Sequence, residues 1–128
     1  MIEQNRLVAV VVEVADLDRS ARLYQDGFGL DLHASNHDEE RDCWIGGRHA
    51  AVSWTHGAFL HFALYQAKGD GPTKGAQFGF AVADIDSVHP RAVAAGAIVV
   101  HEARDEPWGR SARYRDFDGN VIELTQRK

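Results

Sequence analysis

The chain consists of two similar halves. Residues 14–18 (Val-Ala-Asp-Leu-Asp) return as residues 82–86 (Val-Ala-Asp-Ile-Asp), 68 positions later. A second pair, residues 47–50 and 109–112, shares the pattern Gly-Arg-x-Ala at a spacing of 62. At this second spacing His61 falls on Glu123, and the change from 68 to 62 requires only a shorter loop in the second half. A duplicated module predicts equivalent strands that converge on one shared cavity.

Length and composition limit the class of protein. The 128 residues fit a single domain, which we divide into module 1 (about 5–67) and module 2 (about 75–128). The net charge is −5 without a run of Lys or Arg, which argues against nucleic acid as a partner. The single cysteine, Cys43, excludes a cysteine-rich zinc site and suits a cytoplasmic protein. No apolar stretch is long enough for a membrane helix, so no membrane partner is expected.

Each half shows the same predicted order, a strand, a helix and then three strands, which indicates the α+β class. The first helix follows Asp16, and Gly-rich residues 68–75 separate the halves. In the second half Pro90 fits a helix only in its first turn, so we expect that helix to begin near Ser87 and to end at Ala95. The predicted strands cover 7–14, 30–34, 50–54, 58–65, 77–82, 98–102, 110–115 and 120–126.

Alternation within the predicted strands separates two faces. Leu60, Phe62 and Leu64 form a uniformly apolar set that should pack on the helices, and the same holds for 78, 80 and 82. The opposite face then collects four polar side chains, Glu13, His61, Gln77 and Glu123. A sheet face with small residues and few polar groups is typical of a ligand cavity, and two carboxylates favour a cationic or hydrogen-bond-donating ligand. Five aromatic residues are further candidates for stacking on a ligand, namely Trp44, Trp54, Phe59, Trp108 and Tyr114, and Trp44 and Trp108 are favoured.

Two motifs resemble a known family. Residues 14–24 are similar to its opening strand–helix signature, and residues 108–110 with 115–124 are similar to its closing signature, although Phe117 stands where Pro is common. The family is the vicinal oxygen chelate superfamily, also called the glyoxalase/bleomycin-resistance/dioxygenase superfamily. The resemblance implies two tandem βαβββ modules, a curved mixed sheet around a cavity, and a homodimer. It also implies metal-ligand positions in some members, which correspond here to Ala9, His61, Gln77 and Glu123.

Two functions follow from this site. The first is small-molecule binding or sequestration, resembling the bleomycin-resistance proteins, in a cavity that has no cofactor. Ala9 supports it because an alanine side chain cannot bind a metal. The alternative is an enzyme in which His61, Gln77 and Glu123 hold one divalent ion (zinc, nickel, manganese or iron) and a substrate chelates that ion. His61 and Glu123 are also candidates for general acid and base catalysis without a metal.

Overall fold

The computed structural model describes residues 7, 9–35, 49–54, 60–69 and 71–128, and it confirms the α+β class and the two βαβββ modules. Module 1 contains β1 (Ala9–Val14), α1 (Leu17–Arg22), the π-helical turn η1 (Leu23–Gly27), β2 (His33–Ser35), β3 (His49–Trp54) and β4 (Leu60–Gln66). Module 2 contains β5 (Gln77–Ala81), α2 (Ile85–Ala94), β6 (Ile98–Glu106), β7 (Gly109–Arg115) and β8 (Val121–Arg127). None of the helices in the described ranges is long and apolar enough to cross a membrane.

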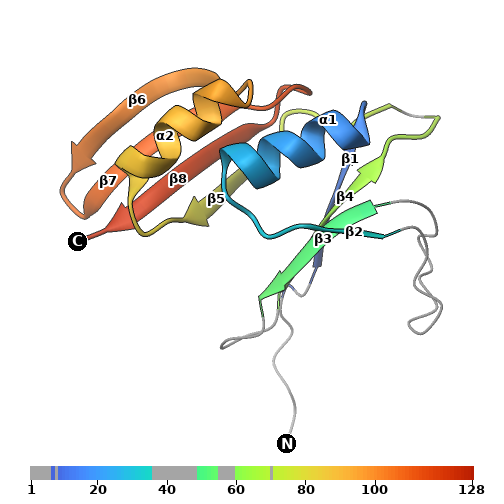
Figure 1. The fold of residues 1–128 in the computed structure, drawn as a ribbon, viewed down its shortest axis with the longest axis horizontal. Coiled ribbons are helices and arrows are strands. Elements are labelled where there is room, and N and C mark those ends of the chain that lie inside the picture. Colours follow the sequence, from blue (N-terminus) through green and yellow to red (C-terminus); the bar gives the residue numbers. More distant parts are fainter. Residues whose placement is uncertain (1–6, 8, 36–48, 55–59, 70) are drawn as a thin grey trace, which may run out of the picture.

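Each module forms its own four-stranded mixed sheet (Figure 1). Sheet A has the order β1-β4-β3-β2, and sheet B repeats it as β5-β8-β7-β6. In both sheets the first and fourth strands of the module are parallel, while the other pairs are antiparallel. β1 and β5 are therefore edge strands, and the described residues contain no ladder between the two sheets.

The strand register corrects one detail of the predicted repeat. Val12 pairs with Leu64 in sheet A, and Phe80, which lies 68 positions after Val12, pairs with Leu124 in sheet B. The fourth strands are therefore related by a spacing of 60 (Leu124 and Leu64), so Glu123 corresponds to Ala63 and not to His61. The third strands keep the spacing of 62, because residues 50 and 112 pair with these same leucines. The connection between the last two strands is thus two residues shorter in module 2, which no shared motif revealed.

One hydrophobic core lies between the two sheets. It takes the predicted helix-facing side chains of both modules, and it includes residues of η1. Phe62 of β4 contacts Phe78 and Phe80 of β5, with ring centroids 5.6 and 5.5 Å apart. Tyr24 of η1 reaches Phe80 at 6.4 Å. The helix-facing sides of the two sheets therefore face each other within one chain, and the opposite sides, which we call the outer faces, point away from this core.

The start of α2 differs from the prediction. The helix begins at Ile85, after Asp84, whose carboxylate accepts hydrogen bonds from the Asp86 amide and the Ser87 hydroxyl. Pro90 therefore lies inside the helix and not in its first turn, so the expected start near Ser87 was wrong. Proline lacks the amide proton for one helical hydrogen bond, and the capping contacts at the N-terminus help to offset that loss.

Candidate functional site

A groove of about 900 Å³ lies between the modules, on the core side of the sheets. Three of its lining residues are polar, Asp31, Gln77 and Arg91, and nearly all the others are apolar. The full lining is Leu7, Val10, Phe28, Gly29, Leu30, Asp31, Val52, Trp54, Leu60, Phe62, Gln77, Phe78, Gly79, Phe80, Ala81, Val82, Ala83, Val88 and Arg91. This volume and this composition suit a mostly apolar small molecule.

Aromatic side chains form one wall of the groove. Phe62, Phe78 and Phe80 come from the first and fourth strands of different modules and pack edge to face. Trp54, at the end of β3, lies 6.5 Å from Phe80 between ring centroids and keeps 38% of its surface exposed. A planar ligand in the groove can therefore stack on Trp54 without displacing any core residue.

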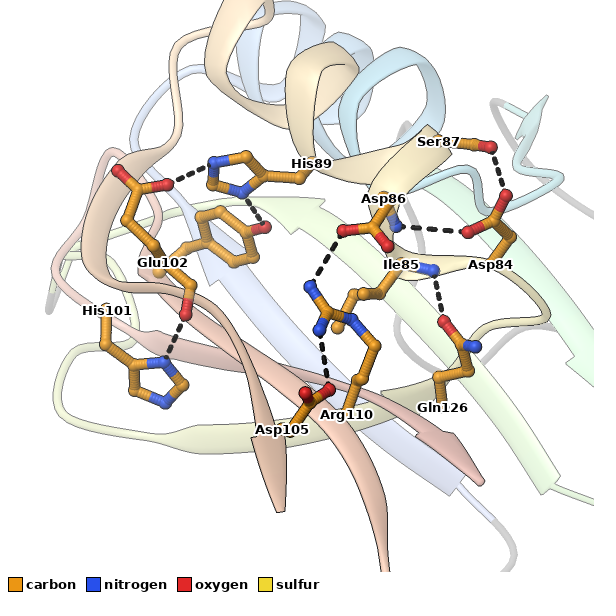
Figure 2. Close-up of polar contacts among 11 residues, drawn as sticks. Asp84, Ile85, Asp86, Ser87, His89, His101, Glu102, Asp105, Arg110 and Gln126 are labelled. Atoms are coloured by element: carbon orange, nitrogen blue, oxygen red, sulfur yellow. Dashed lines mark hydrogen bonds and ion pairs between the residues drawn. The ribbon is translucent and has the colours of Figure 1, made fainter. Parts of the chain in front are cut away.

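Helix α2 forms another wall through Val88 and Arg91, and polar contacts with sheet B hold it in place (Figure 2). At its N-terminus the Ile85 amide donates to the Gln126 side chain at 2.7 Å. At the next residue of the helix, Asp86, the Arg110 guanidinium forms a bridge to Asp105 of β6, at 2.9 Å from Asp86 and 2.6 Å from Asp105. The wall that carries Val88 and Arg91 is thus anchored before any ligand arrives.

The middle of α2 is tied to sheet B by His89. Its Nε2 lies 2.6 Å from Glu102 on β6, and its Nδ1 lies 2.6 Å from the hydroxyl of Tyr114 on β7 (Figure 2). Tyr114 is fully buried, and this burial, together with the nearby Glu102 carboxylate, raises the pKa of Tyr114 to about 12. The tyrosine therefore stays protonated at neutral pH and remains available for the bond to His89.

Of the polar residues predicted to line a cavity, only Gln77 lines this groove. His61 lies on the outer face of sheet A, where its Nδ1 is 2.6 Å from the Ser53 hydroxyl. Glu123 lies on the outer face of sheet B, where it accepts a hydrogen bond from Arg113 at 2.6 Å. The described chain therefore does not bring His61 and Glu123 together as a general acid and base, because they lie on the outer faces of different sheets.

The remaining predicted ligand contacts lie elsewhere or outside the described residues. Glu13 is on the outer side of β1, and its amide donates to the Thr73 hydroxyl at 2.9 Å. Trp108 is 45% exposed and adjoins a separate small pocket with Thr125 and Arg127. Trp44 and Phe59 are outside the described residues. Their roles in ligand binding stay predictions.

Within one chain, the donor set does not fit a metal ion. The register places Ala9 and Gln77, and likewise Ala63 and Glu123, at equivalent positions of the two modules, so one module offers only alanines. The Glu123 carboxylate is ion-paired with Arg113, which competes with any cation. The described residues contain no group of three or more His, Cys, Asp or Glu side chains arranged to hold a metal.

Two features of the sequence indicate the groove, namely the core-side phenylalanines and the short helical segments, although the alternation pattern alone did not predict it. Module 1 places Phe62 on the core side of its fourth strand, and module 2 places Phe78 and Phe80 on the core side of its first strand. The helical segments that should cover them are short, with six residues in α1, five more in the continuous turn η1, and ten in α2. Such short helices cover only part of two four-stranded sheets, so apolar surface remains between the modules. Trp54 was a stacking candidate from the sequence, whereas Arg91 became a site residue only through this tertiary arrangement.

Comparisons with known proteins agree with this fold. A family model described as Glyoxalase/Bleomycin resistance protein/Dioxygenase superfamily matches residues 6–124. No curated protein matches the chain.

Several solved structures are similar over nearly the full length. TnmS3, an antibiotic binding protein from Streptomyces sp. CB03234, is 26% identical with a TM-score of 0.71 and covers 100% of both chains. A glyoxalase/bleomycin resistance protein from the same organism is 27% identical with a TM-score of 0.68, over 94% of this chain and 100% of the other. TioX from Micromonospora sp. ML1 is 25% identical with a TM-score of 0.64, over 97% and 100%.

Proposed function

Because the chain belongs to the glyoxalase/bleomycin resistance protein/dioxygenase superfamily, whose fold serves both enzymes and binders, we propose from its site that it binds and sequesters an apolar small molecule. The groove between the modules is the observation that carries this proposal. Its lining is aromatic and aliphatic, and its polar groups are too few and too far from a catalytic arrangement to suggest turnover. The similarity to the antibiotic binding protein TnmS3 supports a drug or secondary metabolite as the ligand class.

Two tryptophans provide a matched test. Trp54 lines the groove and is 38% exposed, whereas Trp108 is 45% exposed and does not line it. Anthracene-2-carboxamide is a suitable neutral, planar probe, with binding followed by isothermal titration calorimetry. We expect Trp54→Ala to weaken binding by about tenfold or more, as for a buried aromatic contact, and Trp108→Ala to change it less than about twofold.

The outcomes separate the groove from other sites. Equal loss in both variants, or a larger loss in Trp108→Ala, contradicts binding in the groove. Recovery of the probe unchanged after long incubation, checked by mass spectrometry, is expected for a binder. Chemical conversion of the bound molecule at a catalytic rate would instead establish an enzyme.

We also propose that binding needs no metal ion. The support is chemical, since Ala9 and Ala63 cannot ligate and Glu123 is engaged by Arg113. Elemental analysis of protein purified without chelator, before and after incubation with zinc, nickel, manganese and ferrous ions, should find far less than one ion per chain. Near-stoichiometric metal that disappears in His61→Ala would restore the enzyme alternative with His61, Gln77 and Glu123.

The chain is further proposed to form a homodimer. Edge strands β1 and β5 leave backbone groups open to pairing, and His61 and Glu123 on the outer faces are only partly buried. A second copy that covers them would bring these predicted ligand contacts into one cavity. Light scattering coupled to size-exclusion chromatography should give a mass near 28 kDa, about twice that of one 14.2 kDa chain. A monomer at micromolar concentration would leave the outer faces in solvent.

A further inference from the structure

We propose that the ligand of the groove carries a carboxylate, a planar anionic group, which pairs with Arg91. This inference rests on the proposed small-molecule binding and adds the chemical class of the ligand. It reverses the sign of charge expected from the sequence, where Glu13 and Glu123 favoured a cationic ligand. Neither of those carboxylates lines the groove.

Arg91 is the cationic group among the described lining residues. Its guanidinium makes no ion pair or hydrogen bond with the rest of the described chain, unlike that of Arg110, which pairs with Asp86 and Asp105. An arginine beside an apolar groove, without a partner of its own, leaves five N–H donors available to a bound molecule.

The second charged lining residue, Asp31, is already engaged. Its carboxylate lies 3.4 Å from His33 Nε2, and both side chains are largely exposed. Within the described chain, the groove thus has an unpaired cation on α2 and a solvent-exposed anion, beside His33, on the loop after η1. An anionic ligand is therefore best oriented with its charged end toward α2.

The local structure favours this ion pair energetically. The phenylalanines and Trp54 lower the effective dielectric constant on one side of the groove, which strengthens attraction between charges. The contacts of α2 with sheet B fix the helix that carries Arg91, so little ordering is lost when a ligand binds. A guanidinium offers two parallel N–H groups, which match the two oxygens of a carboxylate better than a tetrahedral or spherical anion.

A pair of isosteric probes tests the charge without changing shape. Anthracene-2-carboxylate and anthracene-2-carboxamide have the same ring system, but only the first is anionic at pH 7. With Arg91→Gln we expect about fivefold weaker binding of the carboxylate, since Arg91 is exposed to solvent, and no change for the carboxamide. Arg22→Gln is the matched control, because Arg22 is an exposed helical arginine that does not line the groove.

Removing the negative charge of the groove should change the affinity for the carboxylate probe in the opposite direction. Asp31→Asn removes a negative charge from the groove, so it should tighten the carboxylate by about twofold and leave the carboxamide unchanged. Equal effects of Arg91→Gln on both probes, or none on either, overturn the proposed anion preference. Weaker carboxamide binding in Trp54→Ala would still support the groove in that case. If neither probe binds the wild-type protein, the proposed function fails together with this inference.

Discussion

The two modules share one hydrogen bond, between the start of the helix and the fourth strand, and differ in the side chains of the third strand. In module 1 the Gln66 side chain accepts a hydrogen bond from the Leu17 amide at the start of α1, at 3.0 Å. In module 2 Gln126 accepts one from the Ile85 amide at the start of α2, at 2.7 Å. Leu17 and Ile85 are 68 positions apart, and the two glutamines are 60 apart, as the strand register requires. This contact ties each helix to the fourth strand of its own module.

The side chains at equivalent positions of the two third strands differ in size. Tyr114 on β7 is fully buried and packs against Phe28 at 5.5 Å, whereas its counterpart, Val52 on β3, is smaller and lines the groove. Asp116 is 2% exposed and accepts a hydrogen bond from the Tyr24 hydroxyl at 2.7 Å. Its counterpart is Trp54, which is exposed in the groove.

This difference shows how a duplicated scaffold acquires one binding site where symmetry offers two. On the module 2 side, large side chains and a buried hydrogen bond fill the space between the sheets. On the module 1 side, a smaller residue leaves it open. The helix anchors are alike in both modules, so we attribute the asymmetry to the side chains at these positions and to the hairpin that is two residues shorter in module 2. The predictions below test that interpretation.

The largest expected effect on stability is on the module 2 side, where side chains fill the space between the sheets. Tyr24→Phe removes the hydroxyl that donates to the buried Asp116 carboxylate and should lower the free energy of unfolding by about 2 kcal/mol. Tyr114→Phe removes a bond to the partly buried His89 and should cost about 1 kcal/mol. Urea denaturation of both variants measures the difference. Equal costs would contradict a special role for the buried carboxylate.

On the module 1 side, where the groove is open, Val52→Tyr introduces the side chain that module 2 has at the equivalent position, Tyr114. The larger side chain should occupy the groove and weaken binding of anthracene-2-carboxamide by about tenfold, with little change in the thermal midpoint because the space is already open. Val93→Tyr is the control, since Val93 is 46% exposed on α2 and does not line the groove. Unchanged binding in Val52→Tyr would show that the ligand does not occupy this space.

The stability of the protein should fall at alkaline pH because of the buried Tyr114 of module 2. The pKa of Tyr114 is raised to about 12, so the folded state holds this proton more tightly than the unfolded state. Its contribution to stability is complete below pH 10 and is lost as the pH rises toward 12. Between pH 9 and pH 11, the wild type should lose about 1 kcal/mol more than Tyr114→Phe in urea denaturation. Parallel pH profiles of the two proteins would contradict the raised pKa.

The smallest expected difference is between the shared anchors. Gln66→Ala and Gln126→Ala each remove one acceptor from a helix N-terminus and should each cost about 1 kcal/mol. Gln66 also donates a hydrogen bond to the Ala15 carbonyl at 2.6 Å, so we expect Gln66→Ala to cost about 0.5 kcal/mol more than Gln126→Ala, measured by urea denaturation. If only one of the two substitutions lowers the free energy of unfolding, the hydrogen bond stabilises only that module.

Much of the fold followed from local patterns. Alternation placed Leu60, Phe62 and Leu64 on the core side correctly, because strand side chains alternate whatever lies beyond them. The start of α2 was missed because Pro90 is tolerated inside the helix once Asp84 and Gln126 satisfy its N-terminal amides. The register error had a similar origin, since matching glycines do not report how many residues a hairpin contains.

The sequence by itself determined the duplication, the order of the elements and the face of each strand, because these depend on short-range periodicity and on the conformational preferences of single residues. Only the tertiary structure decided that Glu123 pairs with Arg113, that Ala63 is the counterpart of Glu123, and that the space beside Trp54 stays open. The physical reason is that these outcomes depend on loop length and on side-chain volumes that meet across the core, which residues distant in the chain set together.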